Sequence, residues 1–104
     1  MVRHMILWKL KAMSEEEKME RKKLVKEGLE GLEGQIPGMK KIHVRTEKLP
    51  SSTCDMMLDS IFESEEALKN YSVHPAHVKV AETRIRPYVE IRLCMDYEME
   101  ENEL

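Results

Sequence analysis

The chain has 104 residues, of which 41% are hydrophobic and 36% charged, which suits one folded domain and excludes a disordered protein. Its formal charge is only -3, and its Lys and Arg residues are interspersed with acidic ones, so it lacks the basic stripe that binds nucleic acid. No apolar run is long enough to cross a membrane or to act as a secretion signal. We therefore expect a cytoplasmic protein without a nucleic-acid or membrane partner, in which Cys54 and Cys94 are free thiols.

The first half of the chain has the pattern of a strand, a helix and a second strand. Its opening segment is apolar at both alternating sets of positions, which is typical of a strand covered on both sides. Ser14 and Glu17 then form a capping box, after which apolar residues recur at helical spacing. Pro37 and Gly38 favour a turn. We expect a strand over 2–10, a helix over 14–36, a turn over 36–39 and a strand over 40–48.

The second half repeats a strand, helical segments and a final strand. Ser64 and the acidic residues after it are typical of a helix start, and Pro75 stands at the favourable first position of a further helix. We expect a strand over 55–63, helices over 64–71 and 75–86, a strand over 87–98 and a frayed acidic tail over 99–104.

The order β-α-β-β-α-β predicts an α+β, ferredoxin-like fold with a four-stranded antiparallel sheet. Alternation along the strands predicts which residues face the helices. This set is Ile6, Trp8, Leu10, Ile42, Val44, Leu58, Phe62, Val89, Ile91 and Leu93. No helix remains to cover the other face, which carries apolar side chains together with His43, Arg45, Asp59 and Arg92. We expect a second copy of the chain to cover it, with these four polar residues pairing at the interface.

Five segments, taken in order, are similar to those of a known family. They are "HMILWKLK", "IPGM", "SIFESEEAL", "YSVHPAHVKV" and "RPYVEIRLCMDYE". Over about residues 2–98 the chain resembles the stress-responsive A/B barrel domain (Dabb) family, and we expect this domain to span 1–98. The resemblance implies a homodimer in which two sheets close into a dimeric α+β barrel.

The resemblance also implies candidate site residues, although most members of the family have no assigned activity. One member, a plant polyketide cyclase that forms olivetolic acid, uses a tyrosine and a histidine of the fourth segment, with a first-strand histidine nearby. These positions are Tyr71, His77 and His4 in this chain. Two further pocket positions of that enzyme, a tyrosine and a histidine, correspond here to Leu29 and Met56. We therefore expect a more apolar pocket, with a wall formed by Ile6, Trp8, Leu29, Met56 and His74.

The two histidines around Pro75 have other interpretations. His74 is expected to cap the helix that Pro75 begins, and His77 either acts as an acid–base group or is a half-buried, hydrogen-bonded structural residue. His74 and His77 are three apart, but the proline between them and the absence of a third ligand nearby argue against a metal site. We expect no metal held by side chains and no cofactor. A cation bound by backbone carbonyls, as in some family members, would leave no trace in the sequence.

Three functions remain open on the sequence alone. The first is binding of a small, mostly apolar carbonyl or hydroxyl compound, with cofactor-free acid–base chemistry of a cyclase or lyase type. The second is a non-catalytic dimeric stress or structural protein. The third is a monooxygenase of the wider barrel superfamily, including haem-degrading members, but Trp8 lies on the wrong strand for that pattern.

Overall fold

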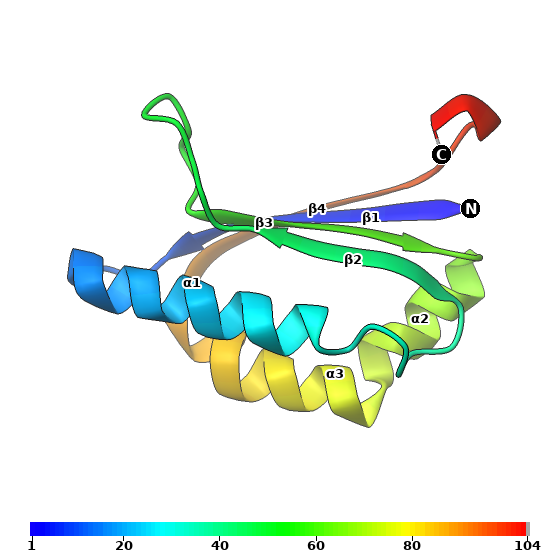
Figure 1. The fold of residues 1–104 in the computed structure, drawn as a ribbon, viewed down its shortest axis with the longest axis horizontal. Coiled ribbons are helices and arrows are strands. Elements are labelled where there is room, and N and C mark those ends of the chain that lie inside the picture. Colours follow the sequence, from blue (N-terminus) through cyan, green and yellow to red (C-terminus); the bar gives the residue numbers. More distant parts are fainter. Residues whose placement is uncertain (104) are drawn as a thin grey trace.

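The computed structural model describes residues 1–103 as a sheet with helices on one side (Figure 1). The predicted β-α-β-β-α-β order is confirmed, except that the second helical region is divided into several parts. The elements are β1 (Val2–Leu10), α1 (Glu15–Glu30), β2 (Met39–Arg45), β3 (Met56–Phe62), α2 (Glu65–Val73), α3 (Pro75–Val80), the π-helical turn η1 (Ala81–Ile85), the 3-10 turns η2 (Arg86–Tyr88) and η3 (Glu101–Glu103), and β4 (Val89–Glu98).

The sheet has the order β2-β3-β1-β4, and every neighbouring pair is antiparallel. The three α-helices lie on one face of it, while the other face is uncovered (Figure 1). The loop between β2 and β3 and the C-terminal segment both rise on the uncovered side. No helix among residues 1–103 is long and apolar enough to cross a membrane.

Local sequence explains where the helices begin and end. The side chains of Ser14 and Ser64 cap α1 and α2 by accepting bonds from backbone N–H groups three residues later. The predicted extension of α1 to residue 36 is wrong, because the helix ends at Glu30 in a glycine-rich segment that costs helical stability. Gly34 and Gly38 both have positive φ, 82° and 79°, and turn the chain into β2.

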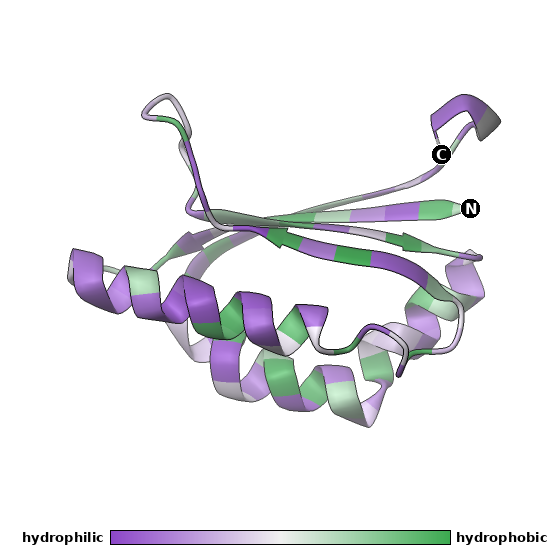
Figure 2. Cartoon of the chain, in the orientation of Figure 1, coloured by the Kyte–Doolittle hydropathy of each residue, from purple (hydrophilic) through white to green (hydrophobic). Residues whose placement is uncertain are grey.

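Between the sheet and the helices lies the hydrophobic core. The core contains the indole of Trp8, which is 3% exposed, and the central residues Leu58 and Phe62 of β3. From α1 it receives Val25 and Leu29, which lie on the apolar side of a helix that is otherwise hydrophilic (Figure 2).

The predicted face of β4 is wrong for Ile91 and Leu93. Trp8 pairs with Arg92, and directly opposed residues of antiparallel strands point to the same face, so Arg92 faces the helices. Ile91 and Leu93 therefore lie on the uncovered face, where Leu93 is 60% exposed. Val89 still faces the core, as predicted, because a register shift near the end of β1 pairs it with Leu10.

The C-terminal segment is more closely attached than its acidic composition predicts. Met99 is buried, and its backbone N–H donates to the carbonyl of Met1 at 2.8 Å. Met99 therefore packs onto the start of β1. Of the predicted tail over 99–104, residue 104 lies outside the described residues.

Candidate functional site

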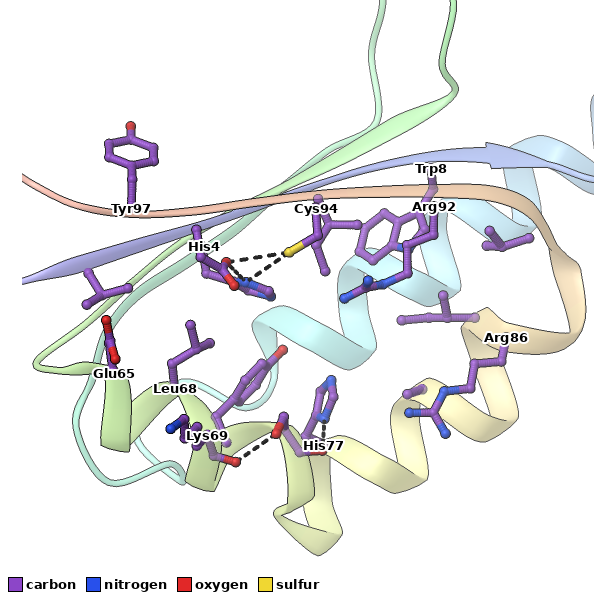
Figure 3. Close-up of a pocket in the computed structure, with 18 of the residues that line it drawn as sticks. His4, Trp8, Glu65, Leu68, Lys69, His77, Arg86, Arg92, Cys94 and Tyr97 are labelled. Atoms are coloured by element: carbon purple, nitrogen blue, oxygen red, sulfur yellow. Dashed lines mark hydrogen bonds and ion pairs between the residues drawn. The ribbon is translucent and has the colours of Figure 1, made fainter.

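A cavity of about 730 Å³ lies between the β1–β4 half of the sheet and the segment from α2 to η2. Its size falls in the range of pockets that hold small organic molecules. Ile6, Trp8 and Val89 give it apolar walls, and polar side chains reach it from both layers (Figure 3).

His77 lies on α3 and reaches the cavity from below in Figure 3. Its Nδ1 is 3.3 Å from the carbonyl oxygen of Ser72, so Nδ1–H is the donor and Nε2 is left as a free acceptor. Burial lowers the pKa of His77 from its ordinary value of 6.5, and the charges of Arg86 and Arg92 act in the same direction. The imidazole is therefore neutral at pH 7 and can accept a proton.

Tyr71 stands near the end of α2 beside His77, with ring centroids 4.1 Å apart. The residue is 2% exposed, and its hydroxyl has no hydrogen-bond partner within residues 1–103. Burial raises the pKa of this phenol, so the hydroxyl keeps its proton and remains a donor. Tyr71 is among the residues that line the cavity, so a ligand oxygen that reaches the hydroxyl can accept that bond.

A third group of polar side chains lines the cavity from the sheet. His4 of β1 is directly opposite Asp96 of β4, and its Nδ1 contacts the Asp96 carboxylate. The Sγ of Cys94 lies 3.8 Å from the same Nδ1 and 3.5 Å from the carboxylate oxygen. Burial and the neighbouring Asp96 raise the pKa of the Cys94 thiol, so it is not an activated thiolate in this state.

Two arginines give positive charge to the part of the cavity beside Cys94. The guanidinium of Arg92 projects from β4 toward the helices, and Arg86 lies across from it (Figure 3). Arg86 is 3.6 Å from Glu82, whereas no carboxylate within residues 1–103 lies at ion-pair distance from Arg92. The cavity can therefore take a ligand with an anionic or strongly polar group in this part.

Comparison with known proteins identifies the family. The model of the stress responsive A/B barrel domain (Dabb) matches residues 2–99. The chain belongs to the Dabb family. A dimeric protein of unknown function with a ferredoxin-like fold from Bacteroides fragilis is 33% identical, with a TM-score of 0.88 over 94% of this chain and 95% of that chain.

Other solved structures have the same fold. A Dabb family protein from Mesorhizobium loti is 24% identical, with a TM-score of 0.73 over 95% of this chain and 96% of that one. A hydroxynitrile lyase from Passiflora edulis is 19% identical, with a TM-score of 0.73 over 96% and 94% of the two chains. At these identities the likeness shows the fold alone. No match was found among the curated proteins.

Within this Dabb domain, five of the residues predicted for the site line one cavity. They are His4, Ile6, Trp8, Tyr71 and His77. Arg92, Cys94 and Asp96 also line the cavity and were not predicted, because the apolar residues of β4 were assigned to the cavity side. The alternation of β4 carried a signal, since its polar residues occupy every second position and strand pairing brings them beside His4.

Three predicted wall residues do not line the cavity. Leu29 of α1 is fully buried in the core, where α1 packs against β2, and Met56 is enclosed in the same core. His74 instead caps α3, as the other interpretation predicted: its Nδ1 accepts from the N–H of Ala76 at 3.1 Å. The cavity is consequently more polar than predicted, because β4 supplies part of its wall.

The four polar residues predicted to pair on the uncovered face do not form one network. The carboxylate of Asp59 accepts two bonds from Arg3, at 2.9 and 2.7 Å, and these bonds lower its pKa. His43 lies 3.1 Å from Glu30, and Arg92 is on the cavity side. Asp59 does form ion pairs on this face, but its partners are Arg3 and, at 3.7 Å, Lys41.

Proposed function

We propose that the cavity binds a small organic compound carrying a carbonyl or hydroxyl group, and that Tyr71 and His77 perform cofactor-free acid–base chemistry on it. The chemistry is of the type used by cyclases and lyases. In this proposal Tyr71 donates a hydrogen bond to the ligand oxygen, and Nε2 of His77 accepts a proton from the ligand.

The observation that carries the proposal is the unpartnered hydroxyl of Tyr71. A buried hydroxyl without a partner costs about 1–3 kcal/mol of folding free energy. A ligand oxygen in the cavity would remove that cost on binding. Because burial also keeps the phenol protonated, the group is suited to donate to an oxygen on which negative charge develops.

His77 supplies the complementary base. The carbonyl of Ser72 fixes the tautomer, and the lowered pKa keeps the ring neutral near pH 7. The ring packs against Tyr71, so one ligand can reach both groups. The passion-fruit protein is a lyase with this fold, which is consistent with such chemistry but does not establish it for this chain.

The ligand class follows from the walls. Ile6, Trp8 and Val89 favour an apolar or aromatic body, which agrees with a mostly apolar compound. Arg92 adds one requirement, namely a polar or anionic substituent that lies beside its guanidinium. A compound with an aromatic ring and a ketone has the apolar body and the carbonyl group, and it serves as the simplest test ligand.

Binding of acetophenone tests the proposal. Its affinity for the wild type and for Tyr71→Phe can be compared by ligand-observed NMR titration, with Tyr88→Phe as a control because Tyr88 lies outside the cavity lining. Loss of one hydrogen bond should weaken binding roughly two- to tenfold in Tyr71→Phe and leave the control unchanged. Equal affinity for all three proteins would refute the role of Tyr71.

We also propose that the working unit is a homodimer formed through the uncovered sheet face. Its apolar side chains come from three adjacent strands. Leu7, Ile91, Leu93 and Met95 are exposed, and Met5 and Met57 are partly exposed. A monomer rarely exposes such a patch to water. The Bacteroides relative is dimeric, which supports the same assembly here. If the cavity binds nothing, this face favours the non-catalytic dimeric protein.

A matched pair of substitutions tests the assembly. Met95 on the uncovered face is 65% exposed, and Met19 on α1 is 70% exposed. We expect light scattering to give a dimer for the wild type and for Met19→Glu, and a monomer for Met95→Glu, because a dimer would bury the new charge. A wild-type monomer, or a dimer that Met95→Glu leaves unchanged, would contradict the proposal.

A further inference from the structure

We propose that His4, Cys94 and Asp96 form a zinc site at the sheet end of the cavity, with a fourth coordination position open to the cavity. Strand pairing produces this group. His4 is directly opposite Asp96, and Cys94 precedes Asp96 by two residues on the same face of β4. His4 and Cys94 lie close together in Figure 3, although they are about ninety residues apart in the chain.

The distances suit tetrahedral coordination. One donor atom from each residue, the Nδ1, the Sγ and a carboxylate oxygen, lies within 4.8 Å of the others. Bonds of about 2.0–2.3 Å to zinc at tetrahedral angles place the ligand atoms about 3.5 Å apart. The observed separations from the Cys94 Sγ, 3.8 Å to the nitrogen and 3.5 Å to the oxygen, are close to that value. Only the hydrogen-bonded contact between His4 and Asp96 has to widen when a metal replaces the proton.

The ligand types select the metal. Imidazole, thiolate and carboxylate together suit Zn²⁺, whereas Mg²⁺ and Ca²⁺ require oxygen ligands. Three protein ligands with an open fourth position are typical of zinc sites that bind a water or a substrate. A metal held by side chains was not predicted from the sequence, because the pairing of β1 with β4 brings together ligands that are far apart in the chain.

The surroundings hold the proposed ligands in place. His4 is 7% exposed on β1, which lies between two other strands, and its backbone carbonyl accepts a bond from the Ser60 hydroxyl at 2.8 Å. Cys94 and Asp96 line the cavity, which gives an ion a path to the site. The ring of Tyr71 is 6.2 Å from that of His4, so the proposed ion would lie beside the tyrosine and histidine of the ligand site.

Metal titration with a matched cysteine control tests the inference. Zn²⁺ binding to tag-free protein is measured by calorimetry, and Co²⁺ is added separately to look for thiolate-to-metal charge transfer and tetrahedral visible bands. The variants are Cys94→Ser, Asp96→Asn and Cys54→Ser, of which only Cys54 lies outside the cavity lining. Each is first checked for a wild-type circular dichroism spectrum, and Asp96→Asn serves if Cys94→Ser does not fold.

We expect one Zn²⁺ per chain in the wild type and in Cys54→Ser. Substituting a residue that hydrogen-bonds to a metal ligand typically weakens metal binding 10–100-fold. Substituting a ligand itself should therefore weaken Zn²⁺ binding at least about tenfold in both Cys94→Ser and Asp96→Asn. The thiolate band of the cobalt protein should disappear in Cys94→Ser. Absence of Zn²⁺ binding in the wild type, or binding that Cys94→Ser leaves unchanged, would overturn the site; the first outcome would mean that Asp96 serves only to orient His4.

Discussion

Tyr71→Phe should make the ligand-free protein more stable. The substitution removes a hydroxyl that is buried without a hydrogen-bond partner in the described residues and keeps the ring. The ring's contacts with Phe62 and His77, at centroid distances of 4.9 and 4.1 Å, do not involve the hydroxyl and should persist.

The magnitude follows from the cost of an unsatisfied group. A buried hydroxyl without a partner costs about 1–3 kcal/mol, so the free energy of unfolding should rise by about 1 kcal/mol or more in Tyr71→Phe. For a chain of this size that corresponds to an increase in melting temperature of roughly 4 °C per kcal/mol. Urea denaturation in ligand-free buffer measures the change.

Tyr88→Phe provides the control. The Tyr88 ring is covered by the guanidinium of Arg21, 3.3 Å from its centroid, and its hydroxyl is not among the buried unpartnered groups. This variant should lie within about 0.5 kcal/mol of the wild type. A loss of stability of about 1 kcal/mol in Tyr71→Phe would show that its hydroxyl is already satisfied, for example by a bound water, and would remove the main argument for ligand binding.

Two further predictions concern the core and the pH dependence. Trp8→Ala should lower the free energy of unfolding by about 3–5 kcal/mol, because the indole is 3% exposed; a loss under about 1 kcal/mol in urea denaturation would contradict its place in the core. Burial lowers the pKa of His77, so the unfolded chain binds the proton more readily than the folded one. Stability should therefore decrease as pH falls below about 6.5 through the lowered folded pKa. This decrease should be smaller in His77→Gln, and an identical pH profile for the two proteins would argue against burial of the ring.

Element order and the helix-facing side of the first strand could be predicted because they depend on local patterns. Ser14 and Ser64 mark helix starts by a bond within one turn, and Trp8 shares its alternation with other core residues. Tyr71 and His77 were indicated by the family resemblance, and the structure places both at the cavity. Their proposed chemical roles remain predictions.

The cavity wall could not be predicted in the same way, because it depends on the pairing of β1 with β4. Hydrophobicity alone assigns Leu93 to the covered side, yet an uncovered sheet face that binds a second copy is also apolar. The register instead turns Arg92 and Asp96 toward the helices. Apolar residues at alternate positions of a strand can therefore face either the core beneath the helices or the uncovered sheet face, and the sequence of the strand does not show which.

Exchange of the methyl hydrogens of acetophenone for deuterium tests the central claim most directly. In D₂O near neutral pH, followed by proton NMR, the wild type should accelerate exchange above the buffer rate, since Tyr71 stabilises the enolate oxygen and His77 removes the proton. His77→Gln should lower the protein-catalysed rate at least about 100-fold, because general bases contribute factors of about 10²–10⁴. His43→Gln, whose histidine lies on β2 outside this cavity, should match the wild type. A wild-type rate no faster than buffer, or equal rates in His77→Gln and the wild type, would contradict the acid–base role of the site.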